Sequence, residues 1–260
     1  MFSLKFVKVF LITLFLLPLG ISAQIKGVIN YKAQIQSPAG IQNLDFITYF
    51  NEHKSIEFGV RKYNQATTDT ISQTESRGEY KRVVANTSKK ELFVLKDFVN
   101  KKLVLGDNIM FNIYYISDSL NNFKWHITTE HKQISNYNCT KATLNFRGRD
   151  YTAWFAEAIP LPFGPWKFCG LPGLIIKIFD QDEKFVYELS GIDLKAKFDD
   201  QFINVPAGYS NDLPITHQKF MSIYDTKVEH YKKMSRVVIS DANGASGTNA
   251  VTLAEKQEKF

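Results

Sequence analysis

The chain has 260 residues, of which 44% are hydrophobic and 22% are charged, with a formal net charge of +6 at pH 7. A chain of this size can bury a sizeable core as one domain. Its basic residues are spread along the sequence, which excludes the clustered basic face of a nucleic-acid-binding protein.

The first 23 residues have the pattern of a secretory signal peptide. Lys5 and Lys8 precede an apolar run over residues 9–19, and Ala23 supplies the small residue after which cleavage is expected. The run is too short for a comfortable membrane span, and no second long apolar segment follows it. The sequence therefore predicts an exported, soluble protein that does not span a membrane once the signal is removed.

After the signal, short segments alternate between apolar and polar positions and are rich in β-branched and aromatic residues, as in half-buried strands. A polar segment over residues 64–79 is long for a connection and is interpreted as a mobile or functional loop. A turn is predicted at residues 106–108. The expected strands are 25–35, 44–50, 55–63, 80–85, 91–98, 103–105, 109–116, 125–127, 138–147, 151–156, 174–179 and 185–192.

One amphipathic helix is predicted late in the chain, starting near Pro214 and Thr216. Its apolar residues form a single stripe that should pack on the sheet: Phe220, Ile223, Tyr224, Val228, Tyr231 and Met234. Residues 24–240 are expected to form the domain, and residues 241–260 a polar, loosely ordered tail.

Many short strands and one late helix predict a mainly β (α+β) fold. We expect a large curved antiparallel sheet or partly open β-barrel, with the C-terminal amphipathic helix packed on it. In outline this architecture is similar to that of bacterial lipoprotein carriers, whose concave apolar face holds acyl chains. That similarity is an analogy of fold.

The most specific run in the sequence is Gly170, Leu171, Pro172, Gly173, Leu174 and Ile175. Pro172 and Gly173 suit the centre of a type II turn, since proline presets φ and glycine accepts a positive φ. The turn should feed a buried strand over residues 174–179. Backbone geometry alone can explain these residues. The alternative is that the loop exposes Trp166, Lys167 and Phe168 as a recognition surface.

This run and the residues before it resemble the GLPGLI family of bacterial envelope proteins, over residues 125–192. The matching residues are Tyr137, Cys139, Lys141, Ala142, Arg147, Gly148, Arg149, Tyr151, Ala153, Trp154, Phe155, Ile159, Pro160, Gly164, Pro165, Lys167 and Phe168. The family has no assigned activity, so the resemblance implies a periplasmic location and no particular chemistry.

The candidate ligand- or partner-binding residues are Arg147, Arg149, Tyr151, Trp154, Trp166, Lys167 and Phe168. Strand alternation places the two arginines and Tyr151 on one face and Trp154 on the other. Such an arginine pair could receive a carboxylate or phosphate group beside an aromatic or acyl surface. The alternative is a structural ion pair to Glu157 or Asp150.

Cys139 and Cys169 leave two alternatives open. In an oxidising periplasm they can form a disulfide. Alternation within residues 138–147 places Cys139 on the polar face, where it could instead act as a nucleophile with His126 or His131 as its base.

The sequence contains no HExxH pair, P-loop, dinucleotide fingerprint or serine elbow, so we expect no catalytic residues, metal or cofactor. The predicted function is non-enzymatic binding of a lipid-like or peptidic ligand, or of an envelope protein. The alternatives are a structural or assembly partner of an outer-membrane transporter, and a thiol-dependent hydrolase centred on Cys139.

Overall fold

The computed structural model describes residues 25–38, 40–60, 90–120, 123–234, 238–240, 246–248 and 255–258. The predicted signal peptide, the polar segment 64–79, the expected strand 80–85 and most of the tail 241–260 lie outside this part of the chain. Within it, no helix has the length and apolar character that crossing a membrane requires.

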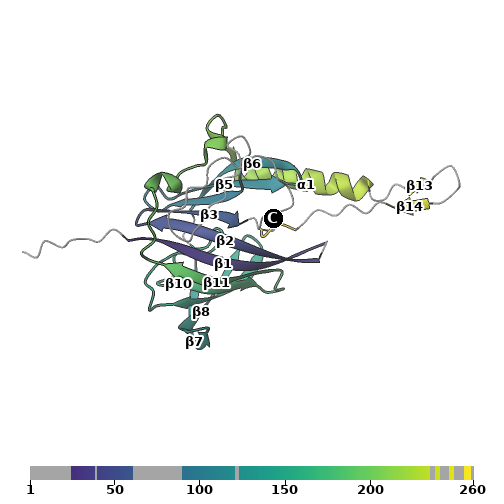
Figure 1. Ribbon diagram of the computed structural model, residues 1–260. Coiled ribbons are helices and arrows are strands. Elements are labelled where there is room, and N and C mark those ends of the chain that lie inside the picture. Colours follow the sequence, from purple (N-terminus) through teal and green to yellow (C-terminus); the bar gives the residue numbers. More distant parts are fainter. Residues whose placement is uncertain are drawn as a thin grey trace, which may run out of the picture.

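Twelve strands form one open sheet (Figure 1), and every neighbouring pair is antiparallel except β12 and β6, which are parallel. Strands β1 to β6 follow one another across the sheet, as do β7 to β11, and β1 pairs with β11 to join these two meanders. The strands are β1 (Lys26–Ser37), β2 (Gly40–Asn51), β3 (Lys54–Val60), β4 (Phe93–Asp97), β5 (Lys102–Ile109), β6 (Asn112–Ser119), β7 (His126–Ile134), β8 (Tyr137–Phe146), β9 (Arg149–Ala156), β10 (Leu174–Asp180), β11 (Phe185–Asp193) and β12 (Ile215–Thr216).

The remaining elements are small apart from one helix. Two short 3-10 helices, η1 (Asp200–Ile203) and η2 (Ala207–Tyr209), precede α1 (His217–Met234), and β13 (Val238–Ser240) pairs with β14 (Ser246–Thr248). The predicted mainly β fold, with a large antiparallel sheet and one late helix packed on it, is confirmed.

Helix α1 begins where the sequence indicated. The Thr216 hydroxyl accepts a hydrogen bond from the backbone N–H of Lys219 at 3.2 Å, which caps the first turn. Phe220 and Met221 are buried against Leu103, Leu105 and Ile116 of the sheet, and Ile223 and Tyr224 pack against the same cluster. The first half of the predicted apolar stripe therefore packs on β5 and β6, whereas Val228 and Tyr231 do not join this cluster.

The turn predicted at residues 106–108 is wrong. Strand β5 runs through these residues, and Ile109 pairs directly with Asn112, so the connection is a two-residue turn whose first residue, Met110, has a φ of 55°. Gly106 has a different role, because a Cβ there would lie 2.8 Å from the backbone oxygen of Glu91 and against the ring of Tyr209. Glycine marks a close approach here and not a turn.

The loop between β9 and β10 folds inward over a buried pair of opposite charges. The ammonium group of Lys96 donates to the backbone oxygens of Gly164 at 2.7 Å and Phe168 at 3.2 Å. The carboxylate of Glu57 accepts the backbone N–H of Trp166 at 3.0 Å. Lys96 and Glu57 are 0% and 2% exposed. These contacts position the loop that carries the GLPGLI run.

Residues 174–179 form the buried strand β10, as predicted, but the turn before them differs from the expected type II turn. Gly170 has a φ of +90°, whereas Gly173 does not adopt a positive φ. Gly173 is needed for a different reason, because a Cβ at this position would collide with the backbone oxygen of Ala156. Close packing of the loop on the end of β9 therefore selects glycine.

We expect Gly173→Ala to lower the free energy of unfolding by about 1–3 kcal/mol, since the added methyl group must displace backbone of Ala156. Urea denaturation measures this change. Gly59→Ala is the matched control, because a Cβ at Gly59 meets its nearest neighbour, the Phe46 ring, at an ordinary 3.8 Å. Equal urea midpoints for the two variants would contradict the conclusion that close packing on Ala156 requires glycine at position 173.

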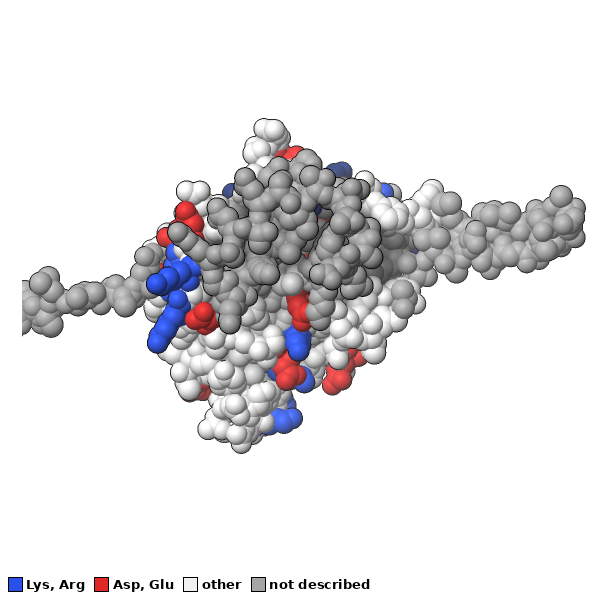
Figure 2. Space-filling model, viewed as in Figure 1, with Lys and Arg blue, Asp and Glu red and all other residues white. Residues whose placement is uncertain are grey.

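Charged side chains on the described part of the face shown in Figure 2 are interspersed, with basic groups next to acidic ones. That part of the face carries no broad patch of one sign. Besides Lys96 and Glu57, several other charged side chains of the described residues are buried, and they form one group.

Candidate functional site

Buried charged side chains gather where β6, the β8–β9 turn, the loop before β10 and the start of α1 meet the segment Glu255–Glu258. Asp118 lies near the end of β6, and His217 is the first residue of α1. Arg147 occupies the β8–β9 turn with a φ of 46°, a conformation that directs the chain tightly from one strand into the next. The members are Asp118, Arg147, Arg149, Lys167, Asp180, His217, Glu255 and Glu258.

The Glu258 carboxylate is held by three nitrogen-bearing side chains. Its Oε1 accepts from Arg147 Nη1 at 2.7 Å and from Lys167 Nζ at 2.8 Å, and its Oε2 lies 2.8 Å from His217 Nε2. The Glu258 side chain is only 5% exposed. The side chains of Arg147, Lys167 and His217 therefore surround a carboxylate of the same chain.

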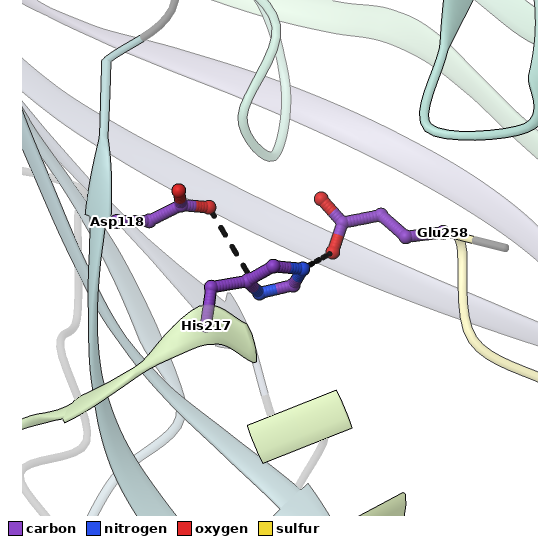
Figure 3. Close-up of side chains that lie close together, drawn as sticks. All are labelled: Asp118, His217 and Glu258. Carbon is purple, nitrogen blue, oxygen red and sulfur yellow. Dashed lines mark ion pairs between the residues drawn. The ribbon is translucent and has the colours of Figure 1, made fainter. Parts of the chain in front are cut away.

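Asp118 organises the cationic groups from the other side. It accepts two hydrogen bonds from Arg147, at 2.8 and 2.9 Å, and one from Lys167 Nζ at 3.1 Å. The imidazole of His217 lies between the carboxylates of Asp118 and Glu258 (Figure 3), with Nδ1 3.9 Å from Asp118 Oδ2. Both carboxylates thus share one arginine, one lysine and one histidine.

The surrounding charges keep both carboxylates ionised. Burial by itself would raise the pKa of Asp118, but the hydrogen bonds from Arg147 and the charge of Lys167 outweigh it, and the pKa lies well below its ordinary value of 3.8. Burial also opposes ionisation of Glu258, and the hydrogen bond from His217 and the charge of Lys167 lower its pKa below 4.5. The Glu258 carboxyl group is therefore bound in its charged form.

The oxygen and nitrogen atoms of Asp118, His217 and Glu258 lie within 4.8 Å of one another, a spacing that can hold a metal ion. Arg147 and Lys167, however, donate to the oxygens of both carboxylates and already match their charge. A divalent cation would have to compete with two positive side chains at short range. The donor set fits carboxylate binding better than metal binding.

Arg149, the first residue of β9, holds the other end of the segment. Its Nη1 donates to Asp180 Oδ2 at 2.9 Å, in an ion pair whose side chains are both 2% exposed. Its Nη2 donates to the carboxylate of Glu255 and to the backbone oxygen of Lys256. Arg149 therefore joins the sheet to the segment 255–258.

The middle of the segment is bound through backbone and side chain. The hydroxyl of Tyr151 donates to the backbone oxygen of Gln257 at 2.7 Å, and the Gln257 amide donates to the hydroxyl of Tyr187. Lys256 Nζ donates to Asp107 Oδ1 at 2.8 Å and to the backbone oxygen of Asn108. Each residue of the segment thus has polar partners on the rest of the domain, which the polar composition of the tail did not indicate.

Of the seven candidate binding residues, the structure brings Arg147, Arg149, Tyr151 and Lys167 around the segment. Trp166 and Phe168 pack beside them, with ring centroids 5.2 Å apart. Trp154 lies apart, in the cluster that contains Cys139. The arginines pair with Asp118 and Asp180, and the suggested partners Glu157 and Asp150 instead bind Thr140 and Asn145.

The expected exposure of Lys167 and Phe168 is wrong, since they are 2% and 0% exposed. The hydrogen bonds from Lys96 and to Glu57 turn the loop inward, so Lys167 reaches the buried carboxylates. Sequence reasoning also missed Asp118, Asp180, His217 and the segment 255–258. These residues are isolated polar positions far apart in the chain, and only tertiary contacts single them out.

Cys139 and Cys169 are both free and buried in the structure. The placement of Cys139 on a polar face is wrong, because Ile134 and the partly buried Tyr137 and Trp154 cover this side of β8 as well. Burial raises the pKa of both thiols, which opposes thiolate formation. His131 contacts the hydroxyl of Thr140 at 3.2 Å. The geometry gives no support to a thiol-dependent hydrolase.

We expect acid to release the segment 255–258. The pKa of Glu258 is lowered in the folded protein, so its contribution to stability is complete above the ordinary value of 4.5 and is lost as pH falls through the folded-state value. The melting temperature of wild type should therefore fall more steeply below pH 4.5 than that of Glu258→Gln. Parallel pH profiles would show that this carboxylate is not the group responsible.

Comparison with known proteins gives a family match over one short segment and distant similarity to solved structures. No curated protein matches the chain in sequence. Among solved structures, PNGF-II in a P21 crystal is 16% identical with a TM-score of 0.49, covering 78% of this chain and 34% of that one, so the chain spans about a third of its length. A LolA superfamily protein from Nitrosomonas europaea, NE2245, is 10% identical with a TM-score of 0.30, covering 70% of this chain and 91% of that one. The family model described as "Protein of unknown function (Porph_ging)" matches residues 147–177, which run from Arg147 through the inward-folded loop into β10.

Proposed function

We propose that the chain is an exported, periplasmic, non-enzymatic binding protein of the GLPGLI family that takes up a carboxylate-bearing ligand or partner. The observation that supports this proposal is that both oxygens of the Glu258 carboxylate are bound, one by Arg147 and Lys167 and the other by His217. These groups sit on the β8–β9 turn, a hydrogen-bonded loop and a helix start, so they are positioned before any ligand arrives.

The chemistry around the segment favours a peptidic ligand over a lipid-like one. The groups that contact it are guanidinium, ammonium, imidazole, hydroxyl and carboxylate groups, which pair with charged side chains and with backbone oxygens. The aromatic side chains beside the site pack against one another, with Trp166, Phe146 and Phe168 in edge contact. An acyl chain would have to displace these rings.

An envelope protein is one form such a ligand can take, and an assembly partner of an outer-membrane transporter remains the alternative role for the same site. In both roles the bound element is a carboxylate on a polypeptide. The site itself, and not the partner's identity, can be tested directly.

The test is chemical rescue of Glu258→Ala by propionate, a short carboxylate whose charged group replaces the one that this substitution removes. We expect about 100 mM propionate to raise the melting temperature of the variant by roughly 3 °C relative to chloride of equal ionic strength. Wild type, whose site is filled, should not respond.

The double variant Glu258→Ala, Lys167→Met is the matched control, since it removes a cation that holds the carboxylate. Rescue that is equal in all three proteins would mean nonspecific salt stabilisation. Either that result or the absence of rescue in Glu258→Ala would remove the proposal.

A further inference from the structure

The segment Glu255–Glu258 is bound as a peptide ligand is bound. It is not one of the twelve sheet strands, and its contacts with the sheet are polar throughout. Carboxylates at its two ends are captured by separate cationic groups, and Arg149 and Tyr151 bind the backbone oxygens between them. Side-chain recognition at both ends and backbone recognition in the middle is a pattern that selects a short peptide sequence.

The charges of the two sides are complementary. The face that receives the segment contributes four cationic side chains that contact it, and three anionic ones, of which Asp107 contacts the segment and Asp118 and Asp180 contact the cations: Arg147, Arg149, Lys167 and Lys184, with Asp107, Asp118 and Asp180. The segment contributes two carboxylates and one ammonium group, so the complex is balanced. Of the carboxylates that Arg147 and Lys167 both contact in the described part of the chain, Asp118 belongs to the receiving face and Glu258 to the segment.

The attachment is also suited to exchange. Glu255 is held partly at the surface, with a side chain 40% exposed and an ion pair to Lys184, which is 34% exposed. Ion pairs of this kind are weakened by salt and carry little net stability. None of the four residues is apolar, so the segment has no hydrophobic anchor in this site.

We propose that Glu255–Glu258 is a resident pseudo-ligand, and that the site's external ligand is an acidic peptide of another protein with two carboxylates three residues apart. This inference rests on the proposed function and specifies its ligand class. The external peptide replaces the segment contact for contact, with its carboxylates on the Arg147–Lys167–His217 group and on Arg149. Because the resident segment is tethered, it competes at a high effective concentration and holds the site closed to weak ligands.

The experiment measures fluorescence anisotropy of a labelled peptide, Glu-Lys-Gln-Glu flanked by two glycines on each side, with full-length protein. In the variant Glu255→Gln, Glu258→Gln the resident segment loses both anchoring carboxylates while the receiving face is intact. We expect the peptide to bind this variant about 100-fold more tightly than wild type. The single variant Glu258→Gln, which changes one buried group only, should lie between the two.

Two peptides serve as controls. One has glutamine in place of both glutamates, and the other, Glu-Glu-Lys-Gln with the same flanks, places the carboxylates side by side. Neither control peptide should bind the double variant more tightly than the Glu-Lys-Gln-Glu peptide binds wild type. Equal binding of the second control would refute the three-residue spacing, and equal binding of both would refute recognition of carboxylates in this register.

Two further outcomes would overturn the inference. A wild-type dimer in light scattering that becomes monomeric in the double variant would make a second copy of this chain the occupant. Absence of peptide binding, with propionate rescue of Glu258→Ala intact, would refute the peptide ligand and leave the carboxylate site standing. Failure of both measurements would instead remove the proposed function itself.

Discussion

Lys96→Met is expected to lower the free energy of unfolding by about 3–5 kcal/mol, the range for leaving a buried charge uncompensated. The substitution leaves the backbone oxygens of Gly164 and Phe168 without their donor, and the buried Glu57 carboxylate without the favourable charge of Lys96. Methionine fills most of the volume, so the loss reports the missing charge and hydrogen bonds. Denaturant unfolding gives the value directly.

The effect of this substitution should depend on pH. Burial raises the pKa of Glu57, and Lys96 opposes that shift, so the pKa of Glu57 rises further when Lys96 is removed. A carboxyl group whose folded pKa is raised favours the folded state below its unfolded pKa, and this advantage is lost as pH rises through the folded value. The difference in the free energy of unfolding between Lys96→Met and wild type should therefore become smaller as pH falls towards 4.5.

Two controls separate the buried pair from general effects of losing a lysine. Lys102→Met removes an exposed lysine of β5 and should change stability by no more than about 0.5 kcal/mol. Glu57→Gln in the Lys96→Met background removes the unpaired carboxylate, so the double variant should be more stable than the sum of the single losses implies. Strict additivity would show that the two groups do not interact.

Arg149→Met is expected to have a loss of similar size, about 3–5 kcal/mol. Asp180, with a side chain 2% exposed, would then keep only the backbone N–H of Phe185 at 2.9 Å as a donor to its carboxylate. The substitution also removes the contact with Glu255 and the backbone oxygen of Lys256. Stability and peptide binding should therefore fall together.

The matched control for this variant is Lys177→Met. Lys177 pairs with Glu188 across β10 and β11, but the two side chains are 34% and 42% exposed, so its removal should cost about 1 kcal/mol or less. Asp180→Asn in the Arg149→Met background should recover part of the stability without recovering peptide binding. If it recovers neither, the loss comes from packing of the arginine stem on the Phe185 ring, whose centroid lies 5.0 Å from the guanidinium carbon.

The stability effects and the binding site have a common origin. The Lys96–Glu57 pair folds the loop 157–173 inward, and this places Lys167 beside Asp118 and Arg147. The matched family segment 147–177 contains both the arginine turn and this loop. A physical reason for the proline- and glycine-rich run follows: it builds a buried loop that delivers one ammonium group to a carboxylate receptor.

Local periodicity was enough to predict the antiparallel sheet, strand β10 and helix α1 with its Thr216 cap, because each depends on residues within a few positions of one another. It also indicated that Arg149 and Tyr151 share a face opposite Trp154. The burial of Cys139 was predicted wrongly because both faces of its strand are covered. A prediction from alternation assumes that one face of the strand is exposed to solvent.

Only the tertiary structure determined which charges meet. Arg147 is 29 residues from Asp118 and 111 from Glu258, and Lys96 is 68 residues from Gly164. No spacing rule connects such positions, because strand order and loop path bring them together. The sequence by itself therefore determined the strands, the helix and a set of candidate cations, and folding alone decided that a segment near residue 258 fills the receptor those cations form.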